Sequence, residues 1–76
     1  MELPIFIENF ADQFDDLDAK DLTPKTEFKD LDAWNSLVAL SIIAMVDEEY
    51  DVTIKGDDIR KATTIEDLFK IVMAKR

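Results

Sequence analysis

The chain has 76 residues, no cysteine, no histidine and a formal net charge of −9. A chain of this length predicts a single domain, residues 1–76, with a small core, and an apolar content of 47% is enough for folding. Without histidine or cysteine there is no Ser-His-Asp triad, no Cys-His pair and no ordinary zinc site. We therefore expect a protein that is not an enzyme and holds no metal.

The charge balance restricts the partners. Eighteen acidic residues face nine basic ones, which argues against binding to nucleic-acid phosphates and to anionic membrane surfaces. Residues 8–32 carry nine acids and three lysines, whereas residues 59–76 carry two acids and five bases. We expect basic patches on the protein partners, no nucleic acid and no membrane insertion.

The sequence shows no targeting segment. The first ten residues lack a basic stretch, and the longest apolar run, residues 37–46, is too short to cross a bilayer. We expect a soluble, cytoplasmic monomer.

One glycine, two prolines and apolar residues at helical spacing predict an all-α fold. The first helix is expected from Leu3 to Phe14, with apolar residues on one stripe. Residues 15–35 form a long irregular stretch, and Thr23-Pro24 marks a turn within it. A loop of this length in a small domain is often functional.

The remaining elements follow the same periodicity. A second helix is expected over residues 36–50 with Asn35 as its N-cap, and residues 51–55 are read as an extended loop. Residues 56–61 should form a short helical turn, and the last helix should run over 65–74 with Thr64 as its N-cap. The result is a small four-helix bundle of three longer helices and one short one.

Ser36 is the first candidate for chemistry. It lies where the acidic loop meets an apolar helix, and unsatisfied N–H groups and the positive end of the helix dipole would stabilise a phosphate there. Serines at helix starts are, however, more often caps. On its position alone, the capping interpretation is favoured.

The residues around Ser36 favour a modification site over a capping role. Trp34-Asn35-Ser36-Leu37, followed by an apolar helix that ends in Asp-Glu-Glu-Tyr, resembles the modification site of acyl carrier proteins. The similarity continues, in the order and at the spacing of that family, in residues 26–31, 47–54 and 62–68.

This resemblance implies an acyl-carrier-type fold and a function. Ser36 would receive 4′-phosphopantetheine from a phosphopantetheinyl transferase, and acyl groups would be carried as thioesters on that arm, in fatty acid, polyketide or other specialised biosynthesis. The further partners would be acyl-transferring, ligating or condensing enzymes with basic or mixed apolar patches. The alternative is an unmodified, carrier-like interaction module.

The sequence departs from the family beside the site. Asn35, an expected partner contact, replaces the usual aspartate and so removes a negative charge where the transferase would dock. Val38 and Ser41 stand where acids are often found. The expected neutral contact face consists of Leu37, Val38, Ser41 and Met45. These residues either meet unusual partners or pack inward, and the sequence leaves both open.

Two further sets follow from the resemblance. Glu48, between Asp47 and Glu49, would contact basic groups of partners, although a run of acids is usually only a solvated face. An acyl chain would lie near apolar residues of a core that parts slightly, and the expected lining is Ile43, Val46, Ile54, Ile59 and Ala62. The five phenylalanines are expected to be core.

A calcium loop is the third candidate. Asp16, Asp18 and Glu27 fall at the first, third and twelfth positions of an EF-hand. Lys20 at the fifth position and Asp21 at the glycine position argue against it, so we expect no metal site here.

Overall fold

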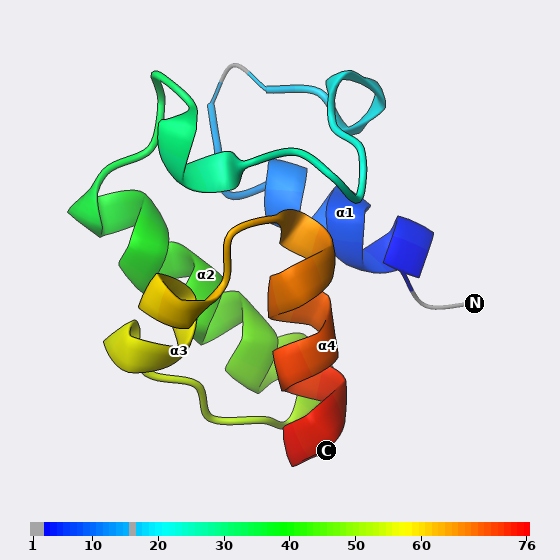
Figure 1. The fold of residues 1–76 in the computed structure, drawn as a ribbon, viewed down its shortest axis with the longest axis vertical. Helices are drawn as coiled ribbons and strands as arrows, with labels where there is room; N and C mark the ends of the chain where they lie inside the picture. Colours follow the sequence, from blue (N-terminus) through cyan, green and yellow to red (C-terminus); the bar gives the residue numbers. More distant parts are fainter. Residues whose placement is uncertain (1–2, 16) are drawn as a thin grey trace.

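The computed structural model describes residues 3–15 and 17–76. These residues form four α-helices, and no strand occurs among them. The helices are α1 (Leu3–Ala11), α2 (Ser36–Tyr50), α3 (Gly56–Lys61) and α4 (Ile65–Lys75) (Figure 1). The all-α bundle with one short helix, expected from the periodicity, is confirmed.

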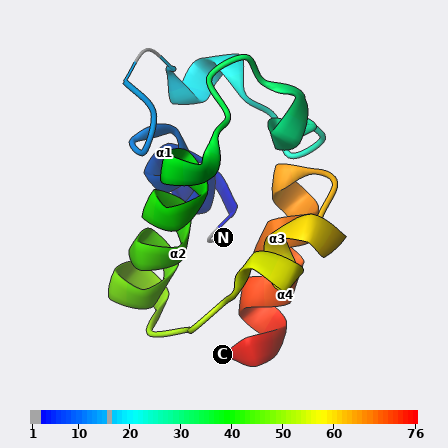
Figure 2. The ribbon, with the colours of Figure 1, turned by 90° about the vertical axis from the view of Figure 1, so that its left-hand side faces the viewer.

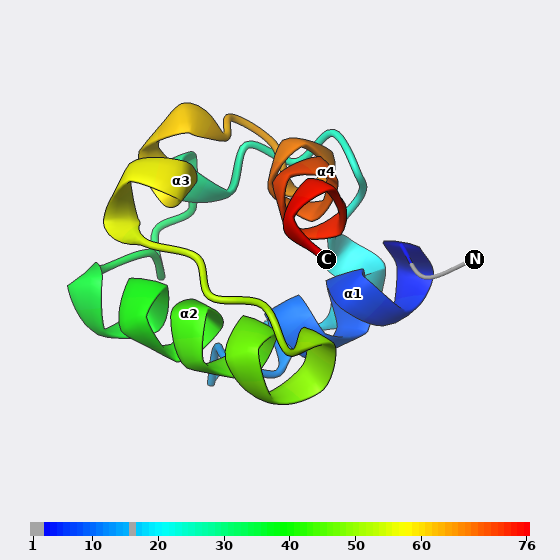
Figure 3. The same cartoon turned by 90° about the horizontal axis from the view of Figure 1, so that it is seen from below.

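The helices surround a common centre (Figure 3). Helices α2 and α4 run in the same general direction, and the long loop between α1 and α2 crosses the end of the molecule where both of them begin (Figure 2). Ser36, the first residue of α2, therefore lies at the looped end. No helix in the described part of the chain is long and apolar enough to cross a membrane.

Aromatic rings connect the core to the looped end. The ring of Phe6 lies 5.4 Å from that of Phe69 on α4 and 6.4 Å from that of Phe10. The Phe10 ring is 5.4 Å from Phe28, whose ring is in turn 5.0 Å from Trp34. Phe6, Phe10 and Phe28 are fully buried, and all five phenylalanines belong to the core or pack against it, as expected.

Helix α1 is shorter than expected. The sequence predicts its end at Phe14, whereas the helix ends at Ala11. The N–H groups of Gln13 and Phe14 bond to the carbonyls three residues before them, so the chain tightens and turns there. Phe14 is nonetheless buried, which explains why its apolar spacing resembled a further helical turn.

The loop from α1 to α2 is more ordered than its composition indicates. It contains two short 3₁₀ helices, Ala19–Asp21 and Phe28–Asp30. It is also fastened to the start of α4: the Ile65 N–H donates to the Thr26 carbonyl at 3.1 Å, and the Glu66 N–H donates to the Pro24 carbonyl at 2.9 Å. Residues 24–26 and 64–66, here called the seam, thus hold the loop in place.

The start of α4 has the predicted cap. Thr64 accepts a hydrogen bond from the Asp67 N–H at 3.1 Å, and the Asp67 carboxylate accepts from the Thr64 N–H at 3.1 Å. Hydrogen bonds from the N–H groups of Thr64 and Thr63 lower the pKa of Asp67. At the seam, the hydrogen bond and charge of Lys25 lower the pKa of Glu66. Both carboxylates thus favour their charged form in the folded chain.

Candidate functional site

The start of α2 holds Ser36 exposed with its hydroxyl uncommitted. Asn35 is the N-cap, and its side-chain oxygen accepts a hydrogen bond from the Val38 N–H at 2.9 Å. The Ser36 hydroxyl makes no hydrogen bond to any other described residue. The interpretation of Ser36 as the helix cap, which its position alone favoured, is therefore wrong, because Asn35 caps the helix. Ser36 is exposed to solvent beside the N–H groups of the first turn.

A groove of about 660 Å³ lies beside Ser36, between the start of α2, the second 3₁₀ helix and α3. Its size falls within the range of about 300–1,000 Å³ that is usual for small-molecule sites. The lining residues are Lys29, Trp34, Asn35, Ser36, Ala39, Leu40, Ile43, Gly56, Ile59 and Arg60. The candidate serine thus opens onto a mainly apolar surface.

The outward face of α2 differs from the expected one. Leu37 is 75% exposed and Val38 and Ser41 are partly exposed, but Met45 is only 4% exposed and belongs to the core. The expectation that Met45 lies on the contact face is wrong. Leu40, which is 62% exposed, takes its place and was missed by the sequence analysis.

The sequence does contain a pattern that predicts the exposure of Leu40. Steps of three and four residues back from the acidic Asp47 lead to Ala44, Leu40 and Leu37, and all four are exposed. The apolar residues alone do not fix which side of the helix faces outward. Since residues 37–46 are apolar nearly all round, their spacing gives no unique outward face.

The acidic end of α2 lies on its last turns. Asp47, Glu48 and Glu49 are all exposed, so each is accessible to a partner. From Asn35 to Val46 the helix and its cap carry no charge, so neutral and acidic surfaces follow one another along one helix.

The expected acyl-lining residues separate into two groups. Ile43 and Ile59 line the groove beside Ser36. Val46, Ile54 and Ala62 are buried in the core, from 0 to 1% exposed. The structure thus brings two of these residues to the groove beside the serine, and the other three lie in the core without lining that groove.

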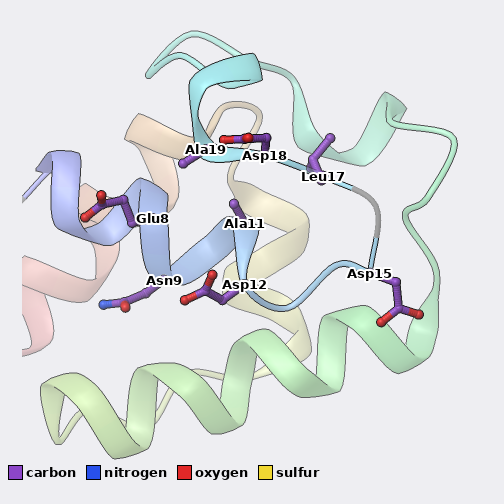
Figure 4. Close-up of a pocket in the computed structure, with 8 residues that line it drawn as sticks. All are labelled: Glu8, Asn9, Ala11, Asp12, Asp15, Leu17, Asp18 and Ala19. Atoms are coloured by element: carbon purple, nitrogen blue, oxygen red, sulfur yellow. The ribbon is translucent and has the colours of Figure 1, made fainter.

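A second hollow, of about 710 Å³, lies at the end of α1, and four acidic residues are among those that line it: Glu8, Asp12, Asp15 and Asp18 (Figure 4). Their carboxylates do not converge on one point. No group of three or more potential ligands in the described ranges could hold a metal ion. Asp16, the first position of the EF-hand pattern, lies outside the described residues.

Comparison with known families identifies the class of protein to which the chain belongs. The family model described as the phosphopantetheine attachment site matches residues 6–72, nearly the whole chain. The chain belongs to this family and is a carrier domain of the acyl-carrier type. Such domains are typically non-catalytic and act with modifying and acyl-handling enzymes. No curated protein and no solved structure gave a significant match.

Proposed function

We propose that the protein is an acyl carrier protein in which Ser36 bears a covalent 4′-phosphopantetheine arm. The observation that carries this proposal is the exposed, uncommitted hydroxyl of Ser36 at the start of α2, inside the region matched by the family. When attached, the arm supplies the thiol that this chain lacks, and on it an acyl group is held as a thioester. We place the carrier in fatty acid, polyketide or another specialised acyl pathway.

The residues around Ser36 suit the attachment reaction. The serine oxygen would form a bond to the phosphorus of coenzyme A that bears the pantetheine unit. The P–O–P linkage would break, adenosine 3′,5′-bisphosphate would leave, and the transferase would take the serine proton. The transferase also supplies the Mg²⁺ for this step. Free N–H groups and the dipole at the start of α2 favour the phosphodiester that results. The carrier itself holds the serine hydroxyl in an exposed position and stabilises the resulting phosphodiester at the start of α2.

The face of α2 supports a partner set with mixed surfaces. Leu37 and Leu40 offer exposed apolar contact near Ser36, Val38 and Ser41 are accessible beside them, and Glu48 offers charge at the far end. We propose that the transferase and the acyl-transferring, ligating or condensing enzymes meet this face with apolar and basic groups. The carrier would act as a cytoplasmic monomer.

Intact mass tests the attachment. Incubation of the purified chain with coenzyme A and a broad-specificity transferase should add one phosphopantetheine mass. Ser36→Ala should abolish the adduct. Thr53→Ala is the matched control, since it also removes an exposed hydroxyl but lies after α2, outside the proposed contact face, and it should load like the wild type.

An absent adduct with several transferases, on a chain shown by circular dichroism to be helical, would contradict the proposal. It would favour the alternative, an interaction module that keeps the fold without the modification.

A further inference from the structure

Asn35 and Ser36 form an exposed Asn-Ser pair at the point where α2 begins. The chain holds one other asparagine, Asn9. Asparagine is chemically labile, because the backbone nitrogen of the following residue can attack its side-chain amide. The attack is easiest where both residues are accessible and the second one has a small side chain. The Asn-Ser pair at the start of α2 meets both conditions.

The attacking nitrogen is free of hydrogen bonds. Ser36 is the first residue of α2, and the first N–H groups of a helix have no acceptor within that helix. The Ser36 N–H makes no hydrogen bond to any other residue in the described part of the chain. Its nitrogen can therefore lose the proton to hydroxide without the loss of a backbone hydrogen bond of α2.

The amide of Asn35 is polarised by the helix that it caps. Its Oδ1 accepts a hydrogen bond from the Val38 N–H at 2.9 Å, so a donor already faces the oxygen on which negative charge develops when Cγ is attacked. The positive end of the α2 dipole stabilises that oxygen and also the deprotonated Ser36 nitrogen. The start of α2 thus combines a free nucleophile with an activated amide.

Asn9 lies in the opposite environment. It is partly buried within α1, and its Nδ2 donates a hydrogen bond to the Tyr50 hydroxyl at 3.4 Å. The residue after it, Phe10, is fully buried, and the Phe10 N–H belongs to the hydrogen-bonded interior of α1. The chain therefore has one accessible asparagine with a free neighbouring nitrogen and one that the fold protects.

We propose that Asn35 is a site of spontaneous deamidation in the folded chain. Hydroxide removes the Ser36 N–H proton, the nitrogen forms a bond to Cγ of Asn35, and Nδ2 leaves as ammonia after taking a proton from water. Water then opens the cyclic succinimide. Cleavage of the bond between Cγ and nitrogen gives aspartate at position 35, and cleavage of the bond between the backbone carbonyl carbon and nitrogen gives isoaspartate. None of these steps needs an arm on Ser36.

The two products differ in what they do to the start of α2. Aspartate keeps an acceptor for the Val38 N–H and adds a negative charge to the stretch from residue 35 to residue 46, which otherwise carries none. Isoaspartate inserts a methylene into the backbone directly before Ser36, and the oxygen that caps α2 becomes part of the main chain. Only the aspartate form therefore keeps Ser36 in its position.

The test starts from the unloaded protein, kept folded in mildly alkaline buffer with the fold checked by circular dichroism. Deamidation raises the mass slightly and adds one negative charge, which intact mass and anion exchange detect. We expect peptide mapping to place the change at Asn35 and to find Asn9 unconverted. Hydroxylamine, which cleaves succinimides, should divide the chain into residues 1–35 and 36–76. A methyltransferase specific for isoaspartate should label the second product.

A pair of variants at one position tests the nucleophile. Ser36→Pro has no N–H at the attacking nitrogen, and proline is well tolerated at the first position of a helix, so the chain should fold and Asn35 should not convert. Ser36→Ala keeps the N–H and removes only the hydroxyl. It should convert like the wild type.

Loading measures the consequence for the carrier, which rests on the proposed function. Asn35→Asp, made directly, represents the first product, and its kcat/KM for loading should rise by about two- to fivefold at low salt, the size of one partly exposed ion pair with a basic transferase. The fraction that carries isoaspartate should lose most of its loading rate. Slower loading of Asn35→Asp would contradict this consequence.

Three results would overturn the deamidation of Asn35. The first is conversion of Asn9 at the same rate, since accessibility and the free nitrogen would then not decide the site. The second is equal conversion in Ser36→Pro, because direct hydrolysis would then account for the product. The third is conversion of Asn35 only after the chain is unfolded in urea. Failure of loading, seen by mass, would instead refute the attachment to Ser36 and would not affect the conversion.

Discussion

At the scale of single residues, the start of α2 divides two tasks between neighbours. The Asn35 side chain satisfies the Val38 N–H, and Ser36 is left with an uncommitted hydroxyl. If one serine were both the N-cap and the attachment site, the helix would lose its cap when the serine was modified. Here the helix end keeps its hydrogen bond whether or not the serine is modified.

The cap gives a stability prediction. Asn35→Ala should lower the free energy of unfolding by about 1 kcal/mol, because the Val38 N–H loses its acceptor. In a domain of this size that corresponds to a fall in melting temperature of about 4–8 °C, measurable by circular dichroism. Asn35→Asp retains an oxygen at the cap and should melt at or above the wild-type temperature. An equal fall in both variants would show that the cap is not what stabilises the helix.

At the scale of elements, the starts of α2 and α4 were predictable and the rotation of α2 about its axis was not. Asn35 and Thr64 are capping residues with local partners, so sequence alone placed both helix starts. The inward side of α2 depends on packing, since its apolar run offers the core several equivalent faces. For that reason Met45, which was expected to be exposed, is buried, and Leu40 is exposed in its stead.

The loop before α2 marks a second limit of the sequence. Its apolar anchors were visible, but the seam joins backbone groups about forty residues apart, which no local pattern encodes. The candidate serine could be predicted, because a motif surrounds it. The groove could not, because its walls come from three separate segments.

The end of α2 gives the prediction at this scale. Asp51 is the C-cap and adopts φ 56°, ψ 39°, the left-handed region that glycine adopts without a steric penalty. Asp51→Gly should raise the free energy of unfolding by about 1 kcal/mol, as relief of this strain and of an acidic charge at the negative helix end outweighs the added entropy of the unfolded chain. Urea denaturation measures the change. Asp51→Ala removes the same charge but keeps the Cβ, and a gain as large as that of glycine would contradict the backbone explanation.

At the scale of the whole molecule, charge is sorted along the chain. Acids dominate residues 8–32 and the end of α2, and bases dominate residues 59–76. A basic partner surface is therefore attracted to part of the molecule only, which orients the encounter before contact.

Reversal of one charge tests this orientation. Glu48→Lys should lower the kcat/KM of transferase loading by about two- to fivefold near 0.05 M salt, and the deficit should shrink near 0.5 M salt as screening increases. Glu8→Lys makes the same change to the net charge on α1 and should have little effect. Equal deficits in the two variants would mean that only the total charge matters.

The seam has a consequence for the timing of modification. The loop that leads to Ser36 is fastened by backbone N–H groups of Ile65 and Glu66, so two of its anchoring hydrogen bonds come from a part of the chain that is synthesised after the serine. A nascent chain that ends before this point presents Ser36 on an unanchored segment. On the proposed function, a transferase that recognises the folded start of α2 would discriminate against unfinished chains, and the arm would be attached only to carriers whose last helix is in place.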